Sequence, residues 1–159
     1  MSRAETYEEV RRQTLSVLEG EPDLTARMAT VACLLAHAFP DNIWTGFYVV
    51  DPLKPDELVV GPYQGTLGCL RIAFGRGVCG TAAASGESQV VEDVHAFPGH
   101  IACDAASVSE IVVPVRGRDG ALIAVLDIDS PARGTFGEVD RVALEGLVAA
   151  VFEEGVSCS

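Results

Sequence analysis

Residues 110–129 read EIVVPVRGRDGALIAVLDID and contain two apolar runs separated by a polar turn. Both runs are rich in β-branched residues, which favour extended strands. The segment RGRDG between them carries two glycines and an aspartate, residue types that are common in tight turns. The stretch therefore predicts two strands that pair as an antiparallel hairpin.

Helical patterns lie at both ends of the chain, and further strands lie between them. Residues 6–20 form an amphipathic pattern that stops at a glycine, and residues 23–39 form a mostly apolar helix with Asp23 as its N-cap. The other predicted helices are a small-residue segment, 77–86, and the C-terminal segment, 136–155. Aromatic and β-branched runs predict strands at 44–50, 57–63, 69–74 and 88–93.

This order of elements predicts a single α+β domain over residues 1–159, with a mainly antiparallel central sheet flanked by helices. The expected parts are a helical segment at 1–40, the sheet and its active-site loops at 42–130, and a C-terminal helix at 137–155. A chain of 159 residues is long enough for one domain with a sizeable core.

The composition excludes several classes of partner. The formal net charge is -12 at pH 7, and no cluster of Lys and Arg interrupts the acidity, so we expect neither a nucleic-acid nor a membrane partner. The charged N-terminus lacks the apolar core of a signal peptide, and no apolar run approaches the ~20 residues of a membrane span. We expect a cytoplasmic protein, in which five cysteines do not form a disulfide framework.

Three carboxylates are predicted to meet at one end of the hairpin. Side chains alternate along a strand, so Asp127 and Asp129 share one face with Ile123, and Leu122 and Ala124 share the other. Counting back from the turn by equal numbers of residues on both strands places Glu110 near the Asp127–Asp129 end, and the three carboxylates could surround one small cavity. Their proximity and burial would raise at least one pKa. The alternatives are a solvated strand end in which Asp129 caps the next turn, an acidic metal-binding patch, or charges that serve solubility.

Four of the five cysteines fall into two groups, and Cys158 lies near the end of the chain. Cys33 lies in an apolar helix and is expected to be buried, whereas three others lie in turns or at the starts of elements. Cys103 stands in the polar loop HAFPGHIACDAASVSE, residues 95–110, and Cys69 stands at the start of a strand. Cys79 lies in the first turn of the helix at 77–86, whose positive end is expected to lower the pKa of its thiol. These three cysteines therefore form a candidate reactive set.

A zinc site is an alternative use of the same loop. His95, His100 and Cys103 have roughly ligand-like spacing, with Cys69 or Cys79 as a fourth ligand. However, the cysteines lack the tight C-x₂₋₄-C spacing of structural zinc sites. We therefore expect no metal, and we expect the histidines to order the loop through hydrogen bonds.

An aromatic pair lies on the first strand. In WTGFY, residues 44–48, the side chains of Trp44 and Tyr48 lie on one face with Gly46 between them. A gap between two rings could hold a small apolar or soft group. The alternative is ordinary core packing.

Taken together, several segments resemble the free methionine-(R)-sulfoxide reductases that are built on a single GAF domain. They are NIWTGFY, VVGPYQGTLGC, IAFGRGVCGTAA, VVEDVHAFPGHIACDAASVSEIVVP and LDIDSP, within residues 42–140. The resemblance implies that Cys103 is the nucleophile, Cys69 the resolving cysteine and Cys79 an auxiliary thiol that can also join a disulfide. It also implies that Trp44 and Tyr48 enclose the methyl-sulfoxide end of the substrate. Glu110, Asp127 and Asp129 would hold the polar end of the substrate and its sulfoxide oxygen.

The resemblance further implies reduction by thioredoxin, a homodimer and no cofactor. The products would be methionine, a cysteine sulfenic acid and then an intramolecular disulfide. The alternative is a GAF module that senses a small molecule or redox state without turnover.

Overall fold

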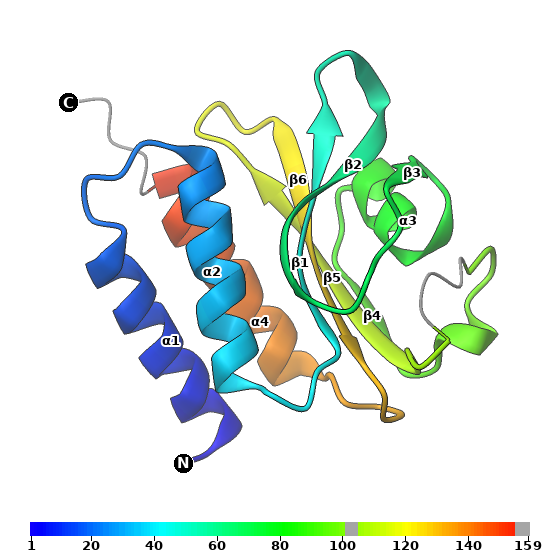
Figure 1. The fold of residues 1–159 in the computed structure, drawn as a ribbon, viewed down its shortest axis with the longest axis horizontal. Helices are drawn as coiled ribbons and strands as arrows, with labels where there is room; N and C mark the ends of the chain where they lie inside the picture. The colour runs from blue at the N-terminus through cyan, green and yellow to red at the C-terminus, as the bar shows by residue number, and fades with distance from the viewer. Residues whose placement is uncertain (101–104, 155–159) are drawn as a thin grey trace.

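A six-stranded antiparallel sheet forms the centre of the molecule, which we describe from a computed structural model for residues 1–100 and 105–154 (Figure 1). The strand order is β3-β2-β1-β6-β5-β4, so the β5–β6 hairpin and β1 occupy the middle of the sheet. The strands are β1 (Trp44–Asp51), β2 (Lys54–Gly65), β3 (Arg71–Ala73), β4 (Gln89–Val91), β5 (Ser109–Arg116) and β6 (Leu122–Ser130). The predicted α+β fold with a mainly antiparallel sheet is confirmed.

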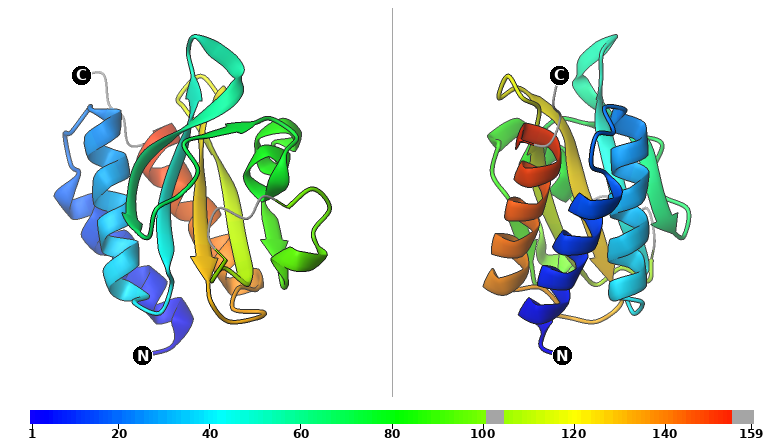
Figure 2. Two further views of the ribbon diagram at one scale, coloured as in Figure 1. Left: turned by 45° about the vertical axis from the view of Figure 1, so that its right-hand side comes forward. Right: turned by 90° about the vertical axis from the view of Figure 1, so that its left-hand side faces the viewer.

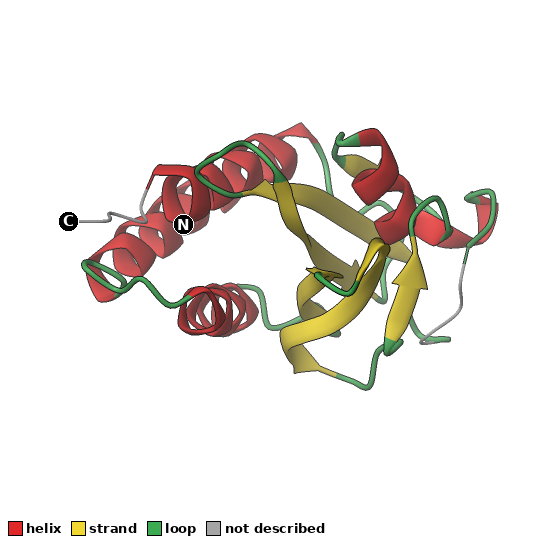
Figure 3. Ribbon diagram, turned by 90° about the horizontal axis from the view of Figure 1, so that it is seen from above, coloured by secondary structure: helices red, strands yellow, loops and turns green. Residues whose placement is uncertain are grey.

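Helices cover both faces of this sheet unequally. Three long helices lie on one face, and the short helix α3 lies on the other (Figures 2 and 3). The 3-10 turn η1 (Val94–Ala96) follows β4, and the π-helical turn η2 (Ala149–Glu154) continues α4. The α-helices are α1 (Arg3–Val17), α2 (Leu24–Ala38), α3 (Gly77–Ser85) and α4 (Glu138–Val148).

The alternation of side chains along the strands creates two cores. On β1, Phe47 packs with the long helices, whereas Trp44 and Tyr48 belong to the core beneath α3. On β6, Leu126 faces the long helices and Val125 faces α3. The chain therefore buries one sheet face in a large core and uses the opposite face for a smaller one.

The hairpin pairs as predicted and brings Glu110 to the Asp127–Asp129 end, but its register differs by two residues from equal counts on both strands. Glu110 lies opposite Asp129, not Asp127, and Val112 lies opposite Asp127. The turn closes with the amide of Gly117 donating to the carbonyl of Ala121, one residue beyond the position assumed in the count. A bulge between Val115 and Arg116 adds the second residue of the shift.

The same bulge changes the alternation at the start of β6. Leu122 was expected to share a face with Ala124, but it packs against the smaller core. Ile123 packs against the larger core, on the side of Ala124. An extra residue in one strand reverses the facing of the side chains beyond it, so this part of the prediction was wrong.

Local signals explain where the helices begin. The Asp23 carboxylate accepts a hydrogen bond from the amide of Ala26 at 2.8 Å, which confirms the predicted N-cap of α2. Helix α3 packs tightly on β3, because a Cβ at Gly80 would lie 2.5 Å from the carbonyl oxygen of Ala73. Only glycine permits this approach, which brings the first turn of α3 over the sheet. Of the helices described, none combines the length and apolarity that crossing a bilayer requires.

Candidate functional site

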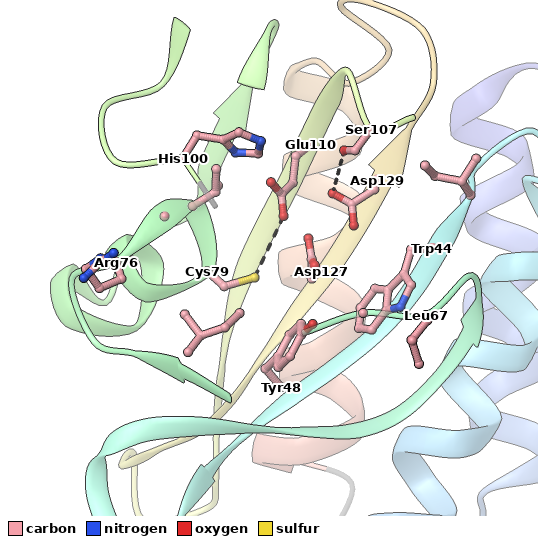
Figure 4. Close-up of a pocket in the computed structure, with 15 residues that line it drawn as sticks. Trp44, Tyr48, Leu67, Arg76, Cys79, His100, Ser107, Glu110, Asp127 and Asp129 are labelled. Atoms are coloured by element: carbon pink, nitrogen blue, oxygen red, sulfur yellow. Dashed lines mark hydrogen bonds between the residues drawn. The ribbon is translucent and has the colours of Figure 1, made fainter. Parts of the chain in front are cut away.

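A small cavity lies between the first turn of α3 and the central strands, and its volume is about 60 Å³ (Figure 4). Six of the eight residues predicted for catalysis or substrate binding line it: Trp44, Tyr48, Cys79, Glu110, Asp127 and Asp129. They come from β1, α3, β5 and β6, and Figure 4 shows Cys79 facing the carboxylates across the cavity. Cys79 thus contributes a thiol and Glu110 a carboxylate, and β1 and β6 supply the other side chains of the site.

The three carboxyl groups form the polar wall of this cavity. Glu110 and Asp127 are buried and Asp129 is half-buried, where Ser107 donates a hydrogen bond to its Oδ1 at 3.3 Å. Burial is the main cause that raises the pKa of each carboxyl group. The neighbouring charge adds to the effect, from Asp127 on Glu110, from Asp129 on Asp127 and from Glu110 on Asp129.

Asp127 has an unusual environment within this group. Asp127 is only 4% exposed, yet its Oδ1 atom has no hydrogen-bond partner. Among the described residues, none of the three carboxyl groups forms an ion pair with a basic side chain. Unsatisfied buried oxygens are costly. The site is therefore arranged to accept a hydrogen-bond donor or a cation.

The pKa of the Cys79 thiol differs from the prediction made from the sequence. Its position in the first turn of α3 was expected to lower its thiol pKa, but the pKa is raised well above the usual value. Burial is the first cause, because the residue is only 4% exposed, and the charges of Asp127 and Glu110 follow. The Sγ atom lies 3.9 Å from Oε2 of Glu110. Nearby carboxylates and burial thus outweigh the helix end.

The predicted gap between the rings of Trp44 and Tyr48 is also absent. The rings of Trp44 and Tyr48 do not leave a slot between them, because they stack with centroids 5.3 Å apart and planes at 16°. They present one shared wall to the cavity instead. Trp44 also stacks on Tyr63, at 4.9 Å, and its buried Nε1 has no hydrogen-bond partner. Gly68 covers the edge of both rings, since a Cβ there would lie 2.8 Å from the Tyr48 hydroxyl.

The remaining cysteines are not among the described residues that line the cavity. Cys69 is half-buried against the smaller core and is disulfide-bonded. Cys103 lies outside the described residues. Cys33 is a free thiol on α2 that is half-buried, not buried as expected, and α2 covers the sheet face opposite the cavity.

The alternative zinc set is not tested as a whole, because Cys103 lies outside the described residues. The rings of His95 and His100 are 6.0 Å apart, and neither histidine joins a group with the geometry for a metal. His100 lines the cavity, and burial, followed by the charge of His95, lowers its pKa.

Sequence reasoning missed other residues that line the cavity, chiefly Ser107 and Arg76. Ser107 stands three residues before Glu110, so its side chain could have been assigned to the same loop end. Arg76 caps the start of α3 with its backbone and is exposed. Its position beside a glycine-rich turn gave no signal that it would border the site.

Asp127→Asn is expected to raise the free energy of unfolding of the ligand-free protein near neutral pH by about 1–3 kcal/mol. The folded state holds the pKa of Asp127 above its ordinary value, so folding favours the protonated form. This contribution to stability is complete in acid and is lost as pH rises through the raised pKa. Asparagine does not titrate, so the difference between variant and native protein should open above the ordinary aspartate range.

Urea unfolding at a series of pH values measures this difference. Asp41→Asn, which changes an exposed aspartate, is the matched control and should leave the stability profile unchanged. Equal or lower stability of Asp127→Asn at neutral pH would show that burial of this carboxyl group is not costly.

Comparisons with known proteins agree on one family. The GAF-domain family model matches residues 22–151. The chain is 46% identical to the free methionine-R-sulfoxide reductase of Escherichia coli, over 94% of this chain and 88% of that protein. It is 38% identical to the reductase of that name from Saccharomyces cerevisiae, over 92% and 84%. The crystal structure of free methionine-R-sulfoxide reductase from Neisseria meningitidis with its substrate superposes with a TM-score of 0.91, at 47% identity, over 98% of this chain and 91% of that one.

Proposed function

Because the chain belongs to the GAF-domain family of free methionine-R-sulfoxide reductases, we propose that it reduces free L-methionine-(R)-sulfoxide to L-methionine. One observation of the structure carries the proposal. Three carboxyl groups without an ion-pair partner among the described residues face a cavity that has a stacked aromatic wall. A free amino acid with a sulfoxide side chain supplies an ammonium group, a polar S–O bond and a methyl group, and these match the two walls.

The carboxyl groups would select the free amino acid. Its α-ammonium can donate to Asp127 and Asp129, and the unpartnered Oδ1 of Asp127 supports this role. In a peptide the ammonium is absent and the chain continues, so the small cavity would reject it. The methyl group would lie against Trp44 and Tyr48, where a sulfur substituent contacts aromatic rings favourably.

Reduction would proceed through the thiols. The thiolate of Cys103 attacks the sulfoxide sulfur while a carboxylic acid protonates the oxygen. The S–O bond of the substrate breaks, the protonated oxygen is transferred to the sulfur of Cys103, and methionine leaves while Cys103 becomes a sulfenic acid. The raised pKa of Glu110 supports this residue as the acid, since burial and the charge of Asp127 favour its protonated form.

A second thiol would complete the cycle. Cys69 attacks the sulfenic acid, water is released and a disulfide forms, with Cys79 as the auxiliary thiol. Thioredoxin, a dithiol protein, would then reduce the disulfide by thiol exchange. We propose that the protein is cytoplasmic, as its N-terminal composition suggests, and that it works as a homodimer, as the family resemblance implies.

A coupled assay tests the function. Oxidation of NADPH is followed with thioredoxin, its reductase, the native protein and either the free R or the free S sulfoxide. We expect NADPH oxidation with the R epimer and very little with the S epimer. No turnover of either epimer, combined with measurable binding of the R form, would favour a sensor module instead.

A further inference from the structure

The position of Cys79 suggests a second use of the cavity. Its Sγ, a carboxylate oxygen of Glu110 and one of Asp127 all lie within 4.8 Å of one another, and all three residues are buried. An ammonium group needs only the oxygens of such a cluster. A thiol in the same place adds a soft ligand, which is suited to a metal ion and is not needed to bind an amino acid.

The distance between Cys79 and Glu110 is close to that expected for two ligands of a tetrahedral metal ion. With Zn–S of about 2.3 Å and Zn–O of about 2.0–2.2 Å, two ligand atoms on one ion lie roughly 3.3–3.7 Å apart. Cys79 Sγ and Glu110 Oε2 are 3.9 Å apart, so a small rotation of either side chain would suffice. The cavity of about 60 Å³ also leaves room for a water molecule as a fourth ligand.

An independent observation also indicates a missing ligand. Oδ1 of Asp127 is buried without any hydrogen-bond partner, on a residue that is 4% exposed. The basic side chains that line the cavity are Arg76, which is exposed, and His100. Neither forms an ion pair with the carboxyl groups among the described residues.

We propose that Cys79, Glu110 and Asp127 form a binding site for Zn²⁺, and that the bound ion excludes the sulfoxide substrate from the same cavity. Binding exchanges protons and moves no electrons: the thiol of Cys79 and any protonated carboxyl group release H⁺ as each forms a bond to the ion. Thiolate and carboxylate ligands together favour zinc over magnesium or calcium, which prefer oxygen alone. This site differs from the histidine-based set considered from the sequence, and it revises the expectation of no metal.

The exclusion of substrate rests on the proposed function, whereas ion binding does not. Asp127 would hold either the ammonium group or the ion, so the two ligands cannot occupy the cavity together. Free zinc would therefore act as a reversible inhibitor, which sulfoxide relieves.

Calorimetric titration of the full chain with zinc sulfate tests the site, with the protein kept reduced by a phosphine. We expect one equivalent to bind. Cys79→Ser and Asp127→Asn should each weaken binding by roughly tenfold or more, since even second-shell changes in metal sites have effects of this size. Cys33→Ser, which removes a thiol outside the cavity, is the control and should bind zinc as the native protein does.

Cobalt provides a second measurement that depends on the sulfur ligand. The native protein with Co²⁺ should show a sulfur-to-cobalt charge-transfer band, and Cys79→Ser should lose it while retaining the native thermal transition. Absence of stoichiometric binding, or unchanged binding in both variants, would overturn the site. The other thiols of the chain would then hold any zinc that binds.

Competition is measured separately. Saturating free methionine-(R)-sulfoxide should weaken the apparent zinc affinity, and unchanged affinity would overturn the exclusion of substrate. An activity assay with a chelator and no zinc distinguishes this result from failure of the proposed function. Turnover there with no competition contradicts only the inference, and absence of turnover contradicts the function itself.

Discussion

The Cys103→Ser protein is expected to form no methionine when it is mixed with free methionine-(R)-sulfoxide, even in a single turnover. A serine hydroxyl is a poor nucleophile toward sulfur and cannot become a sulfenic acid. The buried thiol of Cys79 cannot replace it, because burial and the adjacent carboxylates hold its pKa high and keep it protonated. The measurement is methionine formed per protein chain after the thiols have been reduced and the reductant removed.

Two variants separate the roles of the cysteines. Cys69→Ser should still form methionine once and should lose recycling by thioredoxin, unless Cys79 takes its place. Cys33→Ser is the matched control, a free thiol on α2, and should behave as the native protein does. Equal loss of the single turnover in Cys103→Ser and Cys69→Ser would contradict the division between nucleophile and resolving thiol.

Glu110→Gln is expected to slow the chemical step by ~10²–10⁴-fold, the usual contribution of a general acid. The amide keeps the shape of the side chain but cannot protonate the sulfoxide oxygen. Asp127→Asn and Asp129→Asn should instead weaken use of the free substrate by about 10–100-fold, as loss of one charge-assisted contact predicts. Single-turnover rates at saturating and limiting substrate separate the two effects.

The control for these variants is Glu87→Gln, which changes an exposed glutamate. It should leave both the rate and the apparent affinity unchanged. If Glu110→Gln retained the native rate at saturating substrate, a different group would have to donate the proton, and Glu110 would at most bind substrate.

The hairpin at 110–129 could be predicted from sequence, and its exact pairing could not. Alternating apolar residues specify the strands and the common face of Asp127 and Asp129. The partner of Glu110 depends on a bulge near Val115 and on how the turn closes, and no residue type in the sequence marks either feature. The carboxyl groups still converge, because a shift of two residues keeps Glu110 on the same face.

The site shows where local reasoning fails. Cys79 does occupy the first turn of a helix, but its pKa depends on burial and on carboxylates that arrive from β5 and β6. Likewise, Gly46 separates Trp44 and Tyr48 along the strand, but the rings tilt together in the folded core. Both predictions considered neighbours along one element, whereas these properties arise from contacts between elements.

The most direct test of the central claim compares three compounds with the reduced native protein: free R sulfoxide, free S sulfoxide and N-acetylmethionine-(R)-sulfoxide. The rate of methionine formation, or of N-acetylmethionine formation, is measured in one turnover without thioredoxin. We expect rapid reduction of the free R form, and rates lower by about one to two decades for the acetylated compound, which lacks the ammonium group. The S form should react far more slowly than the free R form. Comparable rates for the free and acetylated R compounds would contradict recognition of the free amino acid by Glu110, Asp127 and Asp129.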